Sequence, residues 1–209
     1  MSRRHAKGGN MSDAGIPMVP ERMLVILTGP VGGGKSTTAL ALAERFRARR
    51  QTAAVIDLDV VYCMARQADG FGEMNIWTTA RRAAAALADA FFRDGLHIVI
   101  VEGEFFSQDE VDALYAHLAT PVERHFVTLM VFLEQALHRV AGDPSRGLSR
   151  NPDFLGWLHA QFVQSLPFLR ASSLVVDAGQ RSPHELAEVI EVMISRSVAD
   201  SSDHISRRG

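Results

Sequence analysis

The chain has 209 residues, which is enough for one domain with a well-packed core. Its hydrophobic content of 47% and its charged content of 22% are typical of a soluble globular protein. The formal net charge of −2 gives no general reason to expect nucleic acid or a membrane as a partner, and no apolar run is long enough to cross a bilayer. The single cysteine, Cys63, excludes an intramolecular disulfide, is expected to serve packing and suits a cytoplasmic protein.

Both ends of the chain are polar. Residues 1–21 combine Ser, Arg, Gly, Asn and Pro without an apolar block, which argues against a secretory signal and favours a disordered tail. Residues 197–209 have a similar composition and are also expected to be disordered. The working domain is therefore predicted to span residues 22–196, and its oligomeric state stays open.

Short apolar runs alternate with segments of helical periodicity along this domain. In chain order, the pattern predicts a strand at 23–27, a helix at 37–46, a strand at 53–56, a long helix at 76–93, a strand at 97–101, a helix at 109–118, a strand at 126–131, a helix at 134–140, a strand at 173–176 and a closing helix from 183. Ser107 and Ser182 are placed to cap the helices that follow them. Five apolar strands separated by helices favour an α/β fold with a mainly parallel sheet covered on both faces.

A glycine-rich segment connects the first predicted strand to the first predicted helix. It reads Gly29-Pro30-Val31-Gly32-Gly33-Gly34-Lys35-Ser36 and fits the phosphate-binding pattern G-x-x-x-x-G-K-S/T at every required position. Glycines allow backbone N–H groups to surround phosphate oxygens, while a lysine reaches the β- and γ-phosphates as a point charge. Ser36 offers its hydroxyl to Mg²⁺. This segment predicts a site for a nucleoside triphosphate.

Carboxylates follow the second and third strands, at the edge of a parallel sheet where ligands bind. Glu102 is placed to hold Mg²⁺, directly or through water, and Glu104 is the nearby alternative. Asp57 is the first choice for accepting the proton of an acceptor hydroxyl or for binding that hydroxyl, and Asp59 is the second. For all of these the alternative is structural, because a carboxylate at a strand end often caps the next helix.

Two further segments complete the predicted site. Arginines at 139, 146 and 150 stand among glycines and prolines, which favours a lid over about 140–156 that closes on the triphosphate, or else a solvated loop. The region between the second and third strands is expected to bind the acceptor. There, Trp77 and Arg81 lie four residues apart on one helix face. Together they would offer a stacking surface and a clamp for an anion or a hydroxyl group. In the alternative, Trp77 anchors the core and Arg81 is solvated.

With these features in place, the chain resembles the small P-loop kinases from about residue 23 to residue 196. The group includes nucleoside monophosphate, shikimate and gluconate kinases, and the nearest branch contains adenylylsulfate kinase and chloramphenicol phosphotransferase. The resemblance rests on the glycine loop, the pair of aspartates, the Glu102-Gly103 strand end and the arginine segment. It implies a three-layer P-loop NTPase sandwich, with a five-stranded parallel sheet in the order 2-3-1-4-5 and a helical lid.

The resemblance also implies roles for individual residues. Gly29 to Thr37 would bind the phosphates of ATP, and Ser36 would bind Mg²⁺. Asp57 would be the base on the acceptor side. Arg139, with Arg146 or Arg150, would supply the lid arginines, and Gln180 belongs to a loop that would lie against the adenine. Glu102 stands where aspartate is more usual in these kinases.

These features predict an ATP-dependent kinase that transfers the γ-phosphoryl group to a hydroxyl of a small molecule. One alternative from another class is a nucleotide switch or ATPase that acts with a macromolecular partner. Another is a toxin-like kinase that acts on a sugar-nucleotide precursor of peptidoglycan. Guanine as the base is disfavoured, because the chain lacks an N/T-K-x-D signature.

Overall fold

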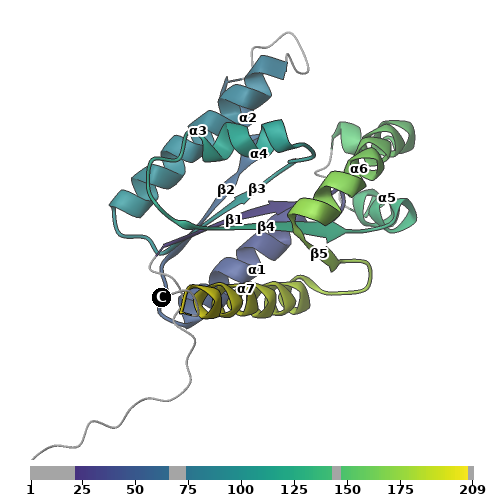
Figure 1. Cartoon of the computed structure of the whole chain (residues 1–209). Helices are drawn as coiled ribbons and strands as arrows, with labels where there is room; N and C mark the ends of the chain where they lie inside the picture. Colours follow the sequence, from purple (N-terminus) through teal and green to yellow (C-terminus); the bar gives the residue numbers. More distant parts are fainter. Residues whose placement is uncertain (1–21, 66–73, 143–146, 207–209) are drawn as a thin grey trace, which may run out of the picture.

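Five parallel strands form the centre of the molecule in a computed structural model that describes residues 22–65, 74–142 and 147–206. They lie in the order β2-β3-β1-β4-β5, which confirms the predicted topology (Figure 1). The strands are β1 (Met23–Thr28), β2 (Ala53–Asp57), β3 (Ile98–Glu102), β4 (Glu123–Met130) and β5 (Leu174–Asp177). β1 and β3 are buried along their whole length, as near-continuous apolar runs require when helices cover both faces of a sheet.

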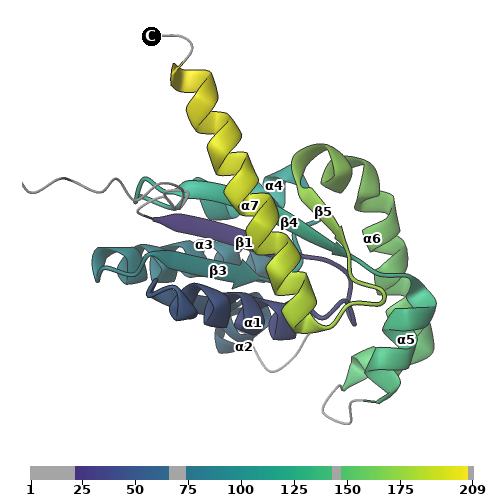
Figure 2. The same cartoon turned by 90° about the horizontal axis from the view of Figure 1, so that it is seen from below.

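Helices cover the two faces of the sheet in two groups (Figures 1 and 2). On one face lie α1 (Lys35–Ala48) and α7 (Pro183–Ser206), which pack against each other. On the other lie α2 (Leu58–Ala65), α3 (Met74–Arg93) and α4 (Gln108–Tyr115). After β4 come α5 (Leu133–Ala141), the 3-10 helix η1 (Leu148–Arg150) and α6 (Pro152–Ser172). The described part of the predicted lid therefore takes in the end of α5, η1 and the beginning of α6.

The apolar side chains of β1 alternate between two cores. Leu24 and Ile26 pack with α3 and α4, whereas Val25 and Leu27 pack with α1 and α7. This alternation follows from the two-residue period of a strand, and it leaves the residues that follow each strand at one edge of the sheet. The predicted helix caps are confirmed, since Ser107 Oγ accepts a hydrogen bond from Glu110 N–H and Ser182 Oγ accepts one from Glu185 N–H.

Three local expectations differ from the structure. α7 continues to Ser206, past the predicted domain end at residue 196, because no glycine or proline interrupts it. Cys63 is exposed, contrary to the expected packing role, because α2 buries Val61 and Tyr62 instead. β4 begins at Glu123, three residues earlier than predicted. The predicted tail at 1–21 lies outside the described residues, and in the described part no helix is both long and apolar enough to span a membrane.

Candidate active site

The glycine-rich loop turns sharply between β1 and α1. Gly32 has a φ of 76°, a left-handed conformation that residues with a side chain rarely adopt. A Cβ atom at Gly32 would also lie 2.9 Å from the carbonyl oxygen of Ala136 on α5. Gly33 N–H donates to Pro30 O at 3.0 Å, which closes the turn. The loop therefore has the compact backbone that a phosphate-binding segment needs.

Lys35 is held across this loop by two backbone carbonyl groups. Its half-buried ammonium group donates to Gly29 O at 3.0 Å and to Pro30 O at 3.3 Å. Within the described residues these carbonyls are its hydrogen-bond partners, and no carboxylate forms an ion pair with it. A lysine held by neutral carbonyls keeps its charge available for phosphate oxygens.

Strand register brings the predicted carboxylates beside the loop. Asp57 is paired with Glu102 across β2 and β3, and Glu102 is paired with Leu27 across β3 and β1. These three residues therefore form one row across adjacent strands, and the glycine loop begins two residues after Leu27. Neither pairing is evident from residue spacing, since the strands are far apart in the sequence.

Glu102 is the most buried of these carboxylates, with 3% of its surface exposed. Burial raises the pKa of its carboxyl group to about 7, with a smaller contribution in the same direction from Asp57 and Asp59. A hydrogen bond with Ser36 and the charge of Lys35 act in the opposite direction on this pKa. The structure thus brings Ser36 and Glu102 into contact, as a pair of oxygen ligands would require.

The described residues of this region form no metal-binding group from protein side chains alone. Among the described residues, no three histidine, cysteine, aspartate or glutamate side chains are grouped to hold an ion. Mg²⁺ in phosphoryl-transfer sites usually has only one or two protein ligands and takes the rest from phosphates and water. The pair formed by Ser36 and Glu102 fits that requirement.

Asp57 caps helix α2 with one oxygen of its carboxylate. Its Oδ1 atom accepts hydrogen bonds from Asp59 N–H at 2.8 Å and from Val60 N–H at 3.3 Å. Asp57 therefore does cap the next helix, which was the structural alternative for this residue, but the cap occupies only Oδ1. No described residue donates to Oδ2. Asp59 lies exposed in the first turn of α2, where its charge acts on Glu102 and Glu104.

Arg81 is not solvated, contrary to one expectation from the sequence. Only 4% of its surface is exposed, and its Nη2 atom donates to Glu104 O at 2.8 Å and to Glu110 Oε1 at 2.7 Å. The guanidinium group also lies 5.3 Å from the centre of the Phe105 ring. A buried guanidinium needs such partners, because an unpaired charge in the interior is costly. Through these contacts Arg81 holds the segment that follows β3 in place.

Trp77 and Tyr62 stack face to face between α3 and α2. Their ring centres are 4.0 Å apart and the ring planes differ by 15°. Trp77 is half-buried and packs against the core beside α2. Because one face of the Trp77 ring is covered by Tyr62, the predicted stacking surface is at most one-sided.

Arg139 joins two loops of the site. From α5, its Nη1 atom donates to Gly32 O and Gly33 O, while Nη2 donates to Ala178 O at 2.6 Å and Gly179 O at 3.1 Å. The first two carbonyls belong to the glycine loop and the others to the loop after β5. Sequence reasoning missed this link, because Gly32 and Ala178 lie 107 and 39 residues from Arg139 in the sequence.

Comparison with known proteins agrees with this geometry. Residues 21–150 match the family model described as adenylylsulphate kinase, and this span is more than half of the chain. The chain belongs to the adenylylsulphate kinase family. Comparison with curated protein sequences gave no significant match.

Several solved structures, two of them kinases, resemble this member of the adenylylsulphate kinase family in fold. A gluconokinase from Sinorhizobium meliloti 1021 has a TM-score of 0.62 at 14% identity, over 90% of this chain and 98% of the other. A shikimate kinase from Acinetobacter baumannii, in complex with shikimate, has a TM-score of 0.59 at 19% identity, over 86% and 96%. A tunicamycin resistance protein from Deinococcus radiodurans has a TM-score of 0.54 at 18% identity, over 83% and 95%. These similarities confirm the P-loop kinase fold.

Other predicted residues of this family member are exposed or lie outside the described residues. Arg150 is exposed in η1, and Gln180 is exposed after β5. Arg146 lies outside the described residues. Other residues of the site carried no recognisable signal in the sequence. Thr28 Oγ1 accepts a hydrogen bond from Phe105 N–H at 2.9 Å, and Glu110 was detectable only as the last member of a helix-capping pattern.

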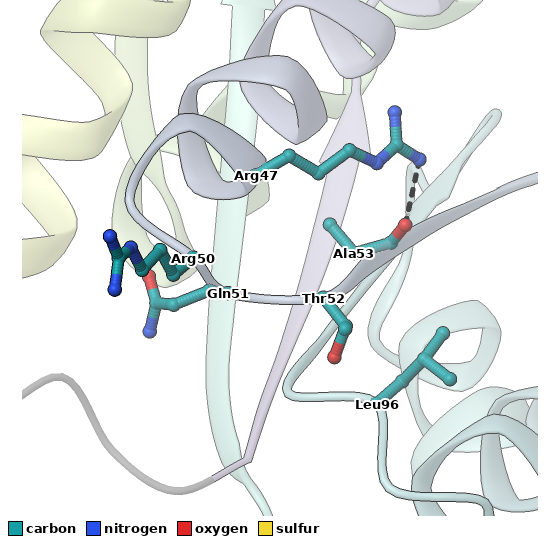
Figure 3. Close-up of a pocket in the computed structure, with 6 residues that line it drawn as sticks. All are labelled: Arg47, Arg50, Gln51, Thr52, Ala53 and Leu96. Carbon is teal, nitrogen blue, oxygen red and sulfur yellow. Dashed lines mark hydrogen bonds between the residues drawn. The ribbon is translucent and has the colours of Figure 1, made fainter.

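A separate hollow lies at the opposite end of the sheet in this kinase fold (Figure 3). It is lined by Arg47, Arg50, Gln51, Thr52, Ala53 and Leu96. The Arg47 guanidinium donates to Ala53 O at 2.7 Å, and arginines at the C-terminal end of α1 suit the negative end of the helix dipole. This hollow is at the wrong end of the strands for phosphoryl transfer, so the candidate active site stays at the glycine loop.

Proposed function

We propose that this chain is an ATP- and Mg²⁺-dependent kinase of the cytoplasm that transfers the γ-phosphoryl group to a hydroxyl of a small molecule. The observation that carries the proposal is the register of Asp57 beside Glu102, next to the glycine loop. One carboxylate is then available for the metal and the other for the acceptor, as phosphoryl transfer requires.

On the nucleotide side, the phosphates of ATP would occupy the loop Gly29–Thr37. Lys35 would exchange its two carbonyl partners for phosphate oxygens. Ser36 and Glu102 would hold Mg²⁺, which neutralises charge on the β- and γ-phosphates when it is bound. Arg139 would keep the glycine loop and the loop after β5 at a constant separation. Arg150 and Gln180 would extend the nucleotide site.

On the acceptor side, Asp57 would receive the proton of the acceptor hydroxyl. The hydroxyl oxygen forms a bond to the γ-phosphorus, the bond between that phosphorus and ADP breaks, and the proton passes to the carboxylate. The hydrogen bonds at Oδ1 orient the Asp57 carboxylate and leave Oδ2 for the hydroxyl. Asp59 is the second candidate for this role, and Trp77 and Glu104 would line the acceptor site.

The similar structures support a small acceptor. Their descriptions name a gluconokinase and a shikimate kinase bound to shikimate, which are proteins that act on or bind small molecules. A neighbour described as a sugar kinase, from Janibacter sp. HTCC2649, has a TM-score of 0.56 at 18% identity, over 86% of this chain and 97% of the other.

The test is the release of ADP from ATP and Mg²⁺, with and without pooled acceptors: sugars, hydroxylated metabolites, nucleosides, nucleotides and aminoglycoside or phenicol antibiotics. We expect one pool to stimulate release, and Lys35→Ala to abolish the stimulation with the fold retained. Slow release that no pool changes would contradict the proposal and favour a switch or ATPase with a macromolecular partner. A separate pool of sugar nucleotides is added, and stimulation by that pool alone would favour the toxin-like kinase.

A further inference from the structure

An arginine stands at a glycine position after the end of α1. Among the described residues, Arg50 is the one residue other than glycine with a positive φ, and its value of 63° lies in the left-handed region. Helices commonly end with glycine in this conformation, because a side chain destabilises it. The turn is closed by hydrogen bonds from Arg50 N–H to Arg47 O at 2.9 Å and from Gln51 N–H to Phe46 O at 3.1 Å.

The side chain of Arg50 does not offset this cost through contacts within the protein. Within the described residues, its guanidinium group has no hydrogen-bond acceptor and no carboxylate partner. Arg50 is also exposed, so it adds nothing to the core. A residue that breaks a local rule without a structural gain is a candidate for binding a ligand.

Arg50 lines the hollow at the edge of the sheet where the strands begin (Figure 3). Arg47, three residues earlier, lines the same hollow. The volume of the hollow is about 450 Å³, which is in the size range of binding sites for small organic molecules. Its apolar lining comes from Ala53, which is buried, and Leu96, which is half-buried. The hollow therefore combines two cations with an apolar surface.

Part of this lining is held in place. The side chain of Arg47 extends toward Ala53 and its Nη2 atom donates to Ala53 O at 2.7 Å (Figure 3). Within the described residues, the other N–H groups of this guanidinium have no acceptor. Thr52, between the two arginines and Ala53 in the lining, is attached to β3, because its Oγ1 atom accepts a hydrogen bond from His97 N–H at 3.0 Å. Arg47 is thus a pre-organised donor on a fixed backbone.

The positive charge at this hollow is not neutralised within the described residues. Two neighbouring arginines, Arg45 and Arg49, form ion pairs with Glu191. No described carboxylate forms an ion pair with Arg47 or Arg50. The C-terminal end of a helix carries about half a negative charge from the helix dipole, which is less than the two positive charges of these arginines. The hollow therefore attracts an anion.

We propose that this hollow is a second binding site, for a small organic anion with a carboxylate or phosphate group on an apolar body. Arg47 and Arg50 bind the anionic group, because guanidinium groups donate paired hydrogen bonds to carboxylates and phosphates. Arg50, which has no partner within the described residues, turns toward the ligand, and Leu96 contacts the apolar body. The site lies at the opposite end of α1 from Lys35, so this inference does not depend on the proposed kinase function.

Four probes separate the contribution of charge from that of apolar contact. 2-Naphthoate and 2-naphthyl phosphate carry both features, 2-naphthalenemethanol has the rings without the charge, and acetate has the charge without the rings. Binding to the full chain is measured by calorimetry. We expect at least one of the two naphthyl anions to bind about tenfold or more tightly than the alcohol and acetate. If neither does, the inference is overturned.

The position of the bound probe is read from backbone amide chemical shifts, with and without MgADP. We expect the shifts to change at residues 51–53 and at Leu96 in both conditions. Changes at Gly32 and Gly33 instead, removed by MgADP, would place the probe in the glycine loop and overturn the inference. A failure of MgADP to bind would contradict the kinase function alone, since the shifts at the hollow would stay.

Arg50→Gly separates ligand binding from stability. Glycine suits the left-handed position, so the unfolding midpoint should stay unchanged or rise. The affinity for the naphthyl anion should fall by about tenfold or more, because a charge-assisted hydrogen bond is lost. Arg170→Gln, at an exposed arginine in the last turn of α6, is the matched control and should change neither value. Unchanged affinity in both Arg50→Gly and Arg47→Gln would overturn the assignment.

Discussion

Asp57 shows how one carboxylate can serve structure and chemistry together. Its Oδ1 atom satisfies two backbone N–H groups at the start of α2, and this contact sets the direction of the whole carboxylate. A base that is oriented by its own helix cap needs no further side chain to position it. The proposal for Asp57 therefore depends on Oδ2 alone.

Asp57→Asn separates these two tasks. Asparagine caps a helix as well as aspartate does, so the unfolding temperature and the affinity for ATP should stay close to those of the wild type. Because an amide does not accept the proton, turnover should fall by about 10²–10⁴-fold. Steady-state kinetics and nucleotide titration measure both effects. A mild loss in Asp57→Asn together with a severe loss in Asp59→Asn would move the base to Asp59.

Glu102 couples the ionisation of the site to the stability of the fold. Its folded pKa of about 7 is higher than the ordinary value of 4.5, so between these values the folded state binds more protons than the unfolded state. The contribution of Glu102 to stability is therefore fully present below about pH 4.5 and is lost as the pH rises through 7.

Glu102→Gln should remove this dependence. From pH 4.5 to above 7, the free energy of unfolding of the metal-free wild type should fall relative to that of the variant by about 3 kcal/mol. Urea unfolding at several pH values measures the difference. Glu44→Gln, at an exposed position of α1, is the control and should run parallel to the wild type. Parallel curves for Glu102→Gln would show that the carboxyl group titrates normally.

At the scale of elements, the turn after β3 determines the spacing between β3 and α2. Gly103 lies between the two glutamates, and a Cβ atom there would be 2.7 Å from Leu58 Cβ and 3.0 Å from Leu58 Cδ2 on α2. This close approach keeps the start of α2, and hence Asp57, next to Glu102. The position is a matter of packing, since the φ of Gly103 is not in the left-handed region.

Gly103→Ala should push α2 away from the end of β3. Overpacking of a well-filled core typically costs about 1–3 kcal/mol, and the displaced carboxylates should also lower turnover. Gly156→Ala in α6 is the matched control, because nothing lies within 4 Å of the added Cβ, and it should be neutral or slightly stabilising. Thermal unfolding and ADP release are measured on both variants. Equal stability of the two variants would show that the Leu58 side chain moves aside without an energetic cost.

At the scale of the whole molecule, an ion-pair network joins the helix that begins at the glycine loop to the helix that closes the chain. Glu191 of α7 has only 2% of its surface exposed. It lies 2.8 Å from Arg45 on α1 and 2.8 Å from Arg49, the C-cap residue of α1. The two arginines remain partly in contact with water. The network lies far from Lys35, at the other end of α1.

Glu191→Gln should therefore affect stability more than catalysis. The variant loses charge-assisted hydrogen bonds, but the arginines left behind can be solvated, so we expect a loss of about 1–3 kcal/mol. KM and turnover should stay close to the wild-type values. Glu188→Gln is the control, since that side chain is 63% exposed and 4.0 Å from Arg45. Equal unfolding midpoints for the two variants would contradict a structural role for the network.

The sequence by itself predicted the fold and the phosphate loop, and it placed the carboxylates at the edge of the sheet. Strand periodicity is local, and once five strands are parallel, the residues that end them share an edge. The pairing of Asp57 with Glu102 came from the register of β2 and β3 in the structure. The same reasoning predicted the caps at Ser107 and Ser182, because a cap and its partner lie three residues apart.

Only the tertiary structure decided what the arginines do. Arg81 meets Glu110 29 residues away, and Arg139 meets Gly32 107 residues away, and no spacing rule connects such pairs. The tertiary structure also left Glu104 without a partner, although Glu102 two residues earlier contacts Ser36. A charged side chain takes its partner from whatever the fold places within reach, so its role follows from packing and not from residue type.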